Sequence, residues 1–387
     1  MARRAGVQVV AIALVAGAAV VGFPAAAGAA VTITVRPGQS IQAAVDAASP
    51  GDTILVKPGR YAEPGVACPA DPAQTCAVAI TKDGIRLIGL ARGGRGVTVV
   101  NPGGQDVGIQ VAKSGNPACL SDPAETVRGS LVRGLAVSGF GSDGLDVVCA
   151  AGWRVSRVRA VGNAEYGIFP SLSGPGRVDH SLASGANDTG IYVGQSHDVR
   201  VDHNTAAGNV SGFEIENSSA VRLDHNKATG DTAGILSFTL PFLAVPSNSG
   251  NRIDHNLVRA NNKANTCTPG GDVCAVPSGS GIAVVAADAN QVDHNQVHGN
   301  SSFGIIVANL CNAFHLSPSQ CAGLGIDPNP DQNHIAFNTV TGNGTAPDPG
   351  IAPLPGADLL WDGAGSGNCW ARNSAGSTFP APLPSCG

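Results

Sequence analysis

The sequence predicts an all-β fold, a single-stranded right-handed parallel β-helix of roughly ten coils with a short N-terminal capping helix. Three observations support this: a repeat of about 22 residues, short stretches that alternate apolar and polar residues, and 52 glycines among 387 residues. Only 13% of the residues are charged while 43% are hydrophobic, which excludes an intrinsically disordered chain. The glycine content and the scarcity of helix formers exclude a long helical protein, and the lack of a three-residue glycine period excludes collagen.

The repeat is marked by a glycine that is followed by an apolar residue. The steps between successive markers are 23, 23, 22, 22, 47 and 23 residues, and the marker glycines are Gly144, Gly167, Gly190, Gly212, Gly234, Gly281 and Gly304. Strand-like alternation follows them, as in Phe213–Glu216. A single coil cannot bury its inner face, whereas coils stacked about 4.8 Å apart can, so the repeat predicts a stack with three short strands per coil.

The N-terminal residues 1–29 are interpreted as a secretory signal peptide. Arg3 and Arg4 precede the charge-free run Val7–Phe23, and Ala27–Ala29 supplies the small residues of a cleavage site. A transmembrane anchor is the alternative, but the run is at the short end of the ~17–25 residues that span a bilayer. We therefore expect a secreted, extracellular protein that has no membrane contact after cleavage.

The rest of the chain contains no linker and is interpreted as one solenoid. We expect an N-terminal cap and first coils over 30–100, the β-helix repeats over 101–345, and a C-terminal coil and cap over 346–387. Ser40–Ala48 predicts the capping helix, because Ile41, Ala44 and Val45 share one face and Ser40 is a suitable N-cap.

The charge balance and the cysteines bear on partners and compartment. Without the signal peptide the chain has 21 basic and 28 acidic residues, a net charge of −7, so no nucleic-acid partner is predicted and we expect a monomer.

The ten cysteines are an even number in an exported chain and predict disulfides. Proximity in sequence suggests the pairs Cys68–Cys76, Cys267–Cys274, Cys311–Cys321 and Cys369–Cys386, leaving Cys119–Cys149. No Cys/His spacing typical of zinc occurs, so no metal site is predicted.

Three segments resemble known proteins. Pro37–Glu63 resembles the start of many secreted parallel β-helix proteins. Gly212–Ser219 and Asp231–Phe238 are similar to a bacterial family of parallel β-helix repeat proteins of the pectin-lyase-like superfamily, beside the nitrous-oxide-reductase accessory proteins. Asp358–Asn373 resembles the C-terminal coil of actinobacterial proteins of this kind. The resemblance covers about 31–387 and implies the fold, but it implies no particular reaction because these repeats are structural.

Stacking would turn repeated polar residues into columns. We expect a structural ladder of inward-pointing turn amides at Asn204, Asn226, Asn256, Asn295 and Asn338. An adjacent Arg-x-Asp-His segment predicts columns of paired arginines and aspartates. We interpret these columns as a solvated wall whose charges neutralise one another. The alternative is a strip that binds an anionic polymer or a surface. The histidines are interpreted as hydrogen-bonded turn residues, with a metal strip or a pH switch as the alternative. They are His180, His203, His225, His255 and His294.

The strand that follows the glycine marker carries the candidate site. Glu214 and Glu216 face outward about 7 Å apart, and aromatic residues lie one coil before and one coil after them. A carboxylate pair between flat apolar faces suits the cleavage of a sugar, which requires an acid, a base and a platform for the ring. Glu214 and Glu216 are therefore the candidate catalytic residues. The candidate substrate-binding residues on the same outward face are Tyr192, Phe238, Asp146 and Phe169.

Three insertions interrupt the repeat next to this strand. Thr239–Gly250, Ala264–Ser280 and Ala308–Asp331 could all wall the same face. The resemblance implies the same place for a groove, because polysaccharide-acting β-helix enzymes have theirs on the equivalent sheet between such loops.

Two functions from different classes remain open. The first is an extracellular protein that binds or processes polysaccharide, with uronate-containing polymers among the candidates and a polysaccharide lyase, glycoside hydrolase or epimerase as the enzyme classes. The signature motifs of uronate epimerases, polygalacturonases and pectate lyases are missing from the sequence. The second is a non-enzymatic secreted scaffold or surface-interaction protein. The two glutamates could also bind a ligand or a cation, with calcium as the candidate, or form a plain solvated face; no other cofactor is predicted.

Overall fold

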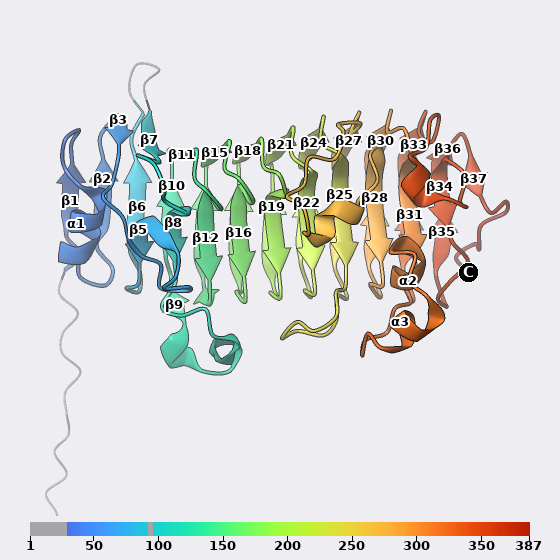
Figure 1. The fold of residues 1–387 in the computed structure, drawn as a ribbon, viewed down its shortest axis with the longest axis horizontal. Coiled ribbons are helices and arrows are strands. Elements are labelled where there is room, and N and C mark those ends of the chain that lie inside the picture. Colours follow the sequence, from blue (N-terminus) through green and yellow to red (C-terminus); the bar gives the residue numbers. More distant parts are fainter. Residues whose placement is uncertain (1–28, 92–95) are drawn as a thin grey trace, which may run out of the picture.

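The computed structural model describes residues 29–91 and 96–387, so the predicted signal peptide lies outside the described residues apart from its last residue. The chain winds into coils that stack along one axis from the N-terminal to the C-terminal end (Figure 1). Three sheets of 12, 11 and 12 strands run the length of the stack, and each strand pairs with its equivalents one coil away. The structure confirms the predicted parallel β-helix. Two of the sheets have 12 strands, against the roughly ten coils expected, and the coil at β8 also has the marker, at Gly108.

Sheet A contains the first strand of most coils. Its order is β1 (Thr32–Val35), β2 (Thr53–Val56), β6 (Arg86–Gly89), β10 (Leu131–Arg133), β14 (Trp153–Ser156), β17 (Gly176–Asp179), β20 (Val199–Asp202), β23 (Arg222–Asp224), β26 (Arg252–Asp254), β29 (Gln291–Asp293), β32 (His334–Ala336) and β35 (Cys369–Ala371).

Sheet B follows sheet A after a turn. Its order is β3 (Gly59–Tyr61), β7 (Val97–Val100), β11 (Leu135–Ser138), β15 (Arg159–Val161), β18 (Leu182–Ser184), β21 (Thr205–Ala207), β24 (Lys227–Thr229), β27 (Leu257–Arg259), β30 (Gln296–His298), β33 (Thr339–Thr341) and β36 (Ser374–Ala375).

Sheet C carries the glycine-marked strands and all the candidate site residues. Its order is β4 (Val66–Ala67), β5 (Thr75–Ile80), β8 (Val107–Val111), β12 (Leu145–Val148), β16 (Ile168–Ser171), β19 (Thr189–Gly194), β22 (Ser211–Glu216), β25 (Ala233–Phe238), β28 (Ser280–Val285), β31 (Phe303–Ala308), β34 (Ala357–Trp361) and β37 (Thr378–Phe379). Only β4 pairs antiparallel in this sheet. A small separate sheet joins β9 (Val127–Arg128) to β13 (Ala150–Ala151).

The helices are short and lie at the N-terminal end or in the insertions. The predicted capping helix is α1 (Ile41–Ala47), whose N-cap Ser40 accepts a hydrogen bond from the backbone N–H of Ala43. The others are the helices α2 (Leu310–Ala313) and α3 (Pro318–Ala322) and the 3-10 turns η1 (Pro117–Leu120), η2 (Pro123–Glu125), η3 (Asp272–Ala275) and η4 (Pro349–Ile351). Over the described part of the chain, no helix is both long enough and apolar enough to cross a bilayer.

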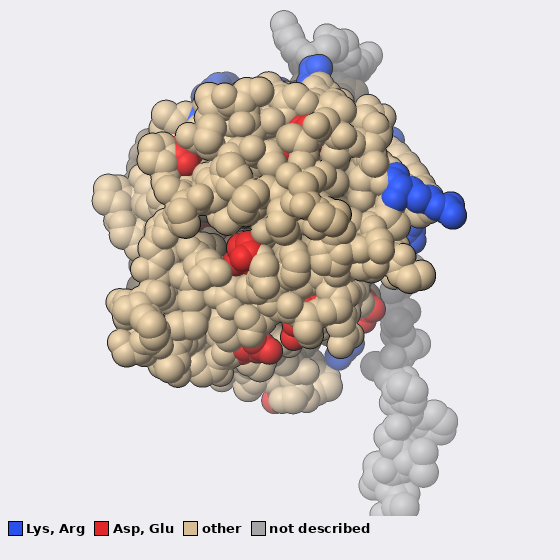
Figure 2. Space-filling view, turned by 90° about the vertical axis from the view of Figure 1, so that its right-hand side faces the viewer, with Lys and Arg blue, Asp and Glu red and all other residues tan. Residues whose placement is uncertain are grey.

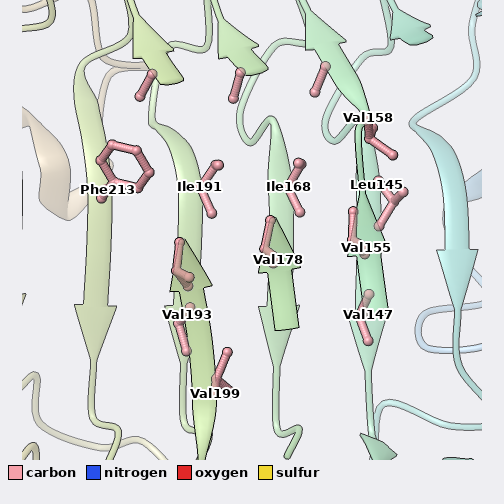
Figure 3. Close-up of a cluster of buried hydrophobic side chains, with 14 of the residues drawn as sticks. Leu145, Val147, Val155, Val158, Ile168, Val178, Ile191, Val193, Val199 and Phe213 are labelled. Atoms are coloured by element: carbon pink, nitrogen blue, oxygen red, sulfur yellow. The ribbon is translucent and has the colours of Figure 1, made fainter. Parts of the chain in front are cut away.

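The interior is a continuous column of aliphatic side chains from the three sheets. Leu145, Ile168 and Ile191 of sheet C are buried opposite Val155 and Val178 of sheet A (Figure 3). The view onto the C-terminal end shows mostly uncharged surface, with Asp and Glu near its centre and in its lower part and Lys and Arg at its margins (Figure 2). Five disulfides join the ten cysteines in the pairs that their spacing suggested.

The marker glycines are required for space rather than for backbone conformation. A Cβ at Gly234 would lie 2.3 Å from Cγ1 of Val258 and 2.8 Å from the carbonyl oxygen of Gly281, the equivalent glycine of the next coil. A Cβ at Gly304 would meet Cγ1 of Val340 at the same 2.3 Å. The chain turns into sheet C at these glycines, and the next coil leaves no room there for a side chain.

The asparagine column forms the expected ladder. The side-chain oxygen of Asn256 accepts from the backbone N–H of Asn226 at 2.9 Å and from its Nδ2 at 3.1 Å, and Asn256 Nδ2 donates to the carbonyl oxygen of Leu223 at 2.8 Å. Two further ladders occupy other turns: Asn209, Asp231, Asn261, Asn300, Asn343 and Asp358 form one, and Asn251, Asn290, Asn333 and Asn368 form the other. Buried turns therefore have their polar groups paired coil to coil.

Replacing one ladder asparagine should destabilise the stack. Asn256→Ala leaves the buried N–H of Asn226 without a partner and takes one acceptor from Asn226 Nδ2, and an unpaired buried group costs about 1–3 kcal/mol. We expect a loss of about 3 kcal/mol in the free energy of unfolding, measured by chemical denaturation. The control Asn262→Ala removes two solvent-exposed bonds, one to the carbonyl of Gly299 and one from the N–H of Ser301, and should cost less than about 1 kcal/mol. Equal losses in the two variants would contradict this account.

Candidate functional site: an acidic and aromatic cleft on sheet C

A cleft of about 1290 Å³ lies over the outer face of sheet C. Its floor is formed by outward residues of the strands from β16 to β31. Its walls come from the three predicted insertions, and the segment that contains η3 lies in front of β22 and β25 (Figure 1). A fourth wall segment, residues 350–354 around η4, was not identified from the sequence. The cleft therefore lies on the face that the sequence indicated.

The two candidate glutamates lie on the floor of this cleft. Glu214 is 3% exposed and Glu216 is 8% exposed, and both line the cleft. Tyr192 is opposite Glu214 on the preceding strand β19, and Phe238 is opposite Glu216 on the following strand β25. Together with Phe169 of β16, all these side chains border one space. The register of the coils thus brings together five of the six predicted site residues.

Asp146 is the exception and does not line the cleft. It is 3% exposed, its Oδ2 accepts from Nε2 of Gln110 at 3.1 Å, and it lies against the carboxyl group of Asp143. The outward position on β12 was predicted correctly, but neighbouring side chains cover it. Burial raises the pKa of Asp146 to about 7 and that of Asp143 well above its usual range. This prediction of a substrate contact is therefore corrected to a buried carboxyl pair.

Three aromatic rings form one wall beside the glutamates. Phe169 and Tyr192 stack with ring centroids 4.6 Å apart and an interplanar angle of 12°, and Tyr166 lies 4.6 Å from Phe169 and 5.3 Å from Tyr192. The Tyr192 ring extends over Gly194, where a Cβ would lie within 2 Å of the Tyr192 hydroxyl. Gly194 pairs with Glu216 in the sheet, so its missing side chain lets the tyrosine hydroxyl reach that carboxylate.

Three further acids border the same space and were missed from the sequence. Asp188 and Glu165 come from the turns that precede β19 and β16, and Asp272 comes from η3 in the wall. Thr189 Oγ1 donates to Asp188 at 3.0 Å, and Ser142 Oγ donates to Glu165 at 3.1 Å. A signal existed for the turn residues, since three successive coils carry an acid one or two positions before the marker glycine, at Asp143, Glu165 and Asp188.

Burial gives these carboxyl groups separate pKa values. Desolvation raises the pKa of Asp188 to about 6 and that of Glu216 to about 7, where hydrogen bonding from Tyr192 partly offsets the rise. The pKa of Glu214 is raised well above its usual range, first by burial and then by the charge of Asp188. Burial therefore favours the protonated form of all three carboxyls, and the charge of Asp188 adds to this effect at Glu214.

The charges that line the cleft are nearly all negative. Among the described lining residues there is no Lys or Arg, and His315 is the one basic side chain, with its Nε2 3.0 Å from the carbonyl oxygen of Gly350. The cleft is thus suited to a ligand that is uncharged or positively charged rather than to a polyanion.

The Arg-x-Asp-His columns lie on sheet A, on a different face from the cleft. Each arginine reaches the aspartate of the next coil, as Arg177 does with Asp202 through two contacts of 2.6 Å. The aspartates are buried beneath the guanidinium groups, so the wall is less solvated than expected. Burial raises the pKa of Asp202. The hydrogen bond and the charge of Arg177 outweigh this effect and keep the pKa below its usual range.

The histidines stack beside this wall at the turn. Their ring centroids are 5.0 to 5.1 Å apart, and each Nδ1 lies 2.8 to 3.0 Å from the aspartate that precedes it. Asp254, His255 and Asp293 have ligand atoms within 4.8 Å of one another, but Arg222 and Arg252 already pair with those carboxylates. The geometry thus supports the interpretation as hydrogen-bonded turn residues.

The buried glutamate should make stability depend on pH. A rise in the pKa of Glu216 from 4.5 to about 7 means that the folded state binds the extra proton in this window, so its stability falls as pH rises. Glu216→Gln keeps the shape and removes the titration. Relative to the parent, the variant should gain up to about 3 kcal/mol in free energy of unfolding between pH 4 and pH 8. Denaturation curves over this range measure it, and parallel pH profiles for the two proteins would contradict it.

Comparisons with known proteins agree with this architecture. The model of a family described as right-handed beta helix region matches residues 92–240. No curated protein matches the sequence. Among solved structures, the chain is similar to two Azotobacter vinelandii modules at 17% identity. The A-module of mannuronan C-5 epimerase AlgE4 gives a TM-score of 0.60, with 86% of this chain and 90% of that chain covered. The A-module of mannuronan C-5 epimerase AlgE6 gives a TM-score of 0.58, with 87% of this chain and 92% of that chain covered. Similarity at this identity establishes the fold alone, and that fold is a right-handed parallel β-helix.

Proposed function

We propose that the protein is an extracellular β-helix protein that binds a neutral saccharide chain in the cleft on sheet C and hydrolyses it there. The observation that carries the proposal is the group of buried carboxyls with separated pKa values, Asp188, Glu214 and Glu216, beside stacked aromatic rings. General acid–base hydrolysis of a glycosidic bond requires one protonated and one ionised carboxyl near the bond. The five disulfides support a site of action outside the cell.

The three carboxyls have different roles in this proposal. Glu214 donates a proton to the leaving oxygen of the glycosidic bond, because burial and the charge of Asp188 raise its pKa and favour its protonated form. Glu216 ionises near pH 7 and acts as the base toward water. Asp188 ionises first, and its charge keeps Glu214 protonated, so it is a positioning residue that acts through another group. Tyr192 and Phe169 provide the flat surface on which a sugar ring stacks.

The charge of the cleft distinguishes hydrolysis of a neutral sugar from the other candidate reactions. A lyase or an epimerase removes the proton next to a uronate carboxylate, and that step is favoured by a positive group that neutralises the carboxylate. The described lining residues of this cleft provide carboxylates and no Lys or Arg at that place. A uronate chain would be repelled by Asp188, Glu216 and Asp272. The named activity of the modules with similar fold is therefore not the one proposed for this chain.

The second candidate is saccharide binding without turnover, as in a secreted scaffold. It is favoured by the low exposure of both glutamates, 3% and 8%, which limits the access of water to the reacting bond. The two candidates predict the same ligand class and differ in whether product is formed.

Removing the acid should abolish turnover and retain binding. A general acid or base raises the reaction rate on the order of 100- to 10,000-fold. Glu214→Gln should therefore lower kcat by at least about 100-fold on any oligosaccharide that the parent cleaves. Binding to the same oligosaccharide, measured by calorimetry, should change by less than about threefold because the amide preserves shape and hydrogen bonding. Leu120→Ala, an exposed residue outside the cleft, is the control and should match the parent. Cleavage by E214Q at the parent rate would refute the assignment of the acid.

Removing the charge of Asp188 should shift the pH profile. In Asp188→Asn the pKa of Glu214 falls because its largest charge repulsion is gone, so the alkaline limb of kcat against pH should move to lower pH. A purely structural role of Asp188 would lower kcat equally at all pH values. An unmoved limb would therefore contradict the proposed role.

A further inference from the structure

The cleft changes its chemistry within one coil. The positions of Glu214 and Glu216 on β22 are taken on the next strand, β25, by Leu236 and Phe238. The same two positions are Ala283 and Val285 on β28, and Ile306 and Ala308 on β31. The floor is thus acidic and aromatic toward the N-terminal end and uniformly apolar over the following three coils.

The walls over these coils are apolar as well. They are formed by Leu240–Leu243 after β25, by Phe314, Leu316 and Leu324 of the α2–α3 segment, and by Ile351 and Leu354 near η4. Two of these wall residues, Ile351 and Leu354, pack with the floor in one apolar cluster. The apolar end is therefore continuous with the acidic end in the same 1290 Å³ cleft.

The polar groups at the apolar end are already engaged within the protein. Oδ2 of Asp362 accepts from the backbone N–H of Asn309 at 2.8 Å and from Nδ2 of Asn312 at 2.7 Å, and its Oδ1 accepts from the N–H of Ala364 at 2.9 Å. His315 is paired with Gly350. Sugar hydroxyl groups placed here would lose their water without gaining partners, which is unfavourable.

An exposed aromatic residue stands at the mouth of this end. Phe242 is 85% exposed and has a φ of +65°, a conformation that costs energy for a bulky residue. It is the most exposed large apolar side chain among the described residues and lies in the wall segment after β25. Leu240, Pro241 and Leu243 line the cleft beside Phe242, so the apolar lining extends to the rim as a continuous patch, which is typical of a binding surface.

We infer that the ligand is an amphipathic glycoside, with a neutral sugar at the acidic end and a hydrocarbon aglycone along the apolar end. This inference rests on the proposed function and adds the second half of the ligand. A ligand of sugars alone would leave three coils of apolar floor unused, and a pure hydrocarbon would leave buried carboxyls beside it without polar partners. The volume of 1290 Å³ exceeds the roughly 300–1,000 Å³ of ordinary small-molecule sites and has room for both parts.

The test compares matched glycosides by calorimetry with the mature protein, below the concentration at which the ligands form micelles. Methyl and octyl glycosides of glucose, galactose and mannose are the probes. For a sugar that binds, the octyl form should bind at least about 100-fold more tightly than the methyl form, because several methylenes leave water. Octyl glucuronide should bind at least about tenfold more weakly than octyl glucoside, because the acidic end repels its carboxylate.

A rim variant tests where the aglycone lies. Phe242→Ser should weaken binding of the octyl glycoside about tenfold and leave the methyl glycoside unchanged. Leu120→Ser, an equally drastic change of an exposed apolar residue outside the cleft, is the matched control and should bind both as the parent does. Because Phe242 is exposed, its replacement is not expected to affect folding.

The outcomes separate this inference from the proposed function. Oligosaccharides that bind or are cleaved, with no gain from methyl to octyl, would leave the proposed function standing and overturn the amphipathic ligand. Octyl tetra(ethylene glycol) binding as tightly as the octyl glycosides would also overturn it, because the sugar would then contribute nothing. Absence of binding and of cleavage with every saccharide and every glycoside would overturn both.

Discussion

The in-register stacking of successive coils is the constraint on which the rest of the structure depends. Each backbone position meets its own equivalent one coil away, as in the series Val201, Leu223 and Ile253 of sheet A. A residue type that packs favourably against its own kind can occupy the same position in every coil. A residue type that repels its own kind needs a compensating residue in the neighbouring column. The aliphatic interior, the amide ladders and the alternating Arg–Asp wall are three solutions to this requirement. The marker glycines are a fourth, because the closest approach of two coils permits no side chain at all.

This constraint explains how much the sequence revealed. The marker glycines, the turn asparagines and the cysteine spacings recur or pair locally, so the fold, one ladder and the disulfide pattern could be predicted from them. The same register placed Tyr192 and Phe238 on either side of the glutamates without any knowledge of the loops. Asp272 and the wall around η4 could not be placed in this way. They lie in turns and insertions, whose paths depend on tertiary packing rather than on the repeat. The burial of Asp146 was missed for the same reason.

The spacing of the coils sets the spacing of the groups that line the cleft. Because each coil contributes one residue to each outward column, a change of side chain from one coil to the next converts directly into a change of chemistry along the groove. Glu216 followed by Phe238 marks such a boundary between an ionisable surface and an apolar one. The rigidity of the sheet fixes the distance between the two kinds of surface, whereas the inserted loops determine what can enter. Recognition and scaffold can therefore vary independently in this architecture.

The stacked histidines have a further consequence for what that side of the molecule can contact. From His203 to His294 both faces of each ring are covered by the rings of the neighbouring coils, the column ends on Phe337, and Arg372 lies over that last ring. Only ring edges remain to meet another molecule, so this strip can offer hydrogen bonds but no flat surface for stacking. The centroids of neighbouring rings also lie about 5 Å apart. Two nitrogens bound to one zinc ion lie closer together than this, because each Zn–N bond is about 2.0–2.1 Å long. One ion could bridge adjacent rings only if they left the parallel arrangement that the aspartates hold.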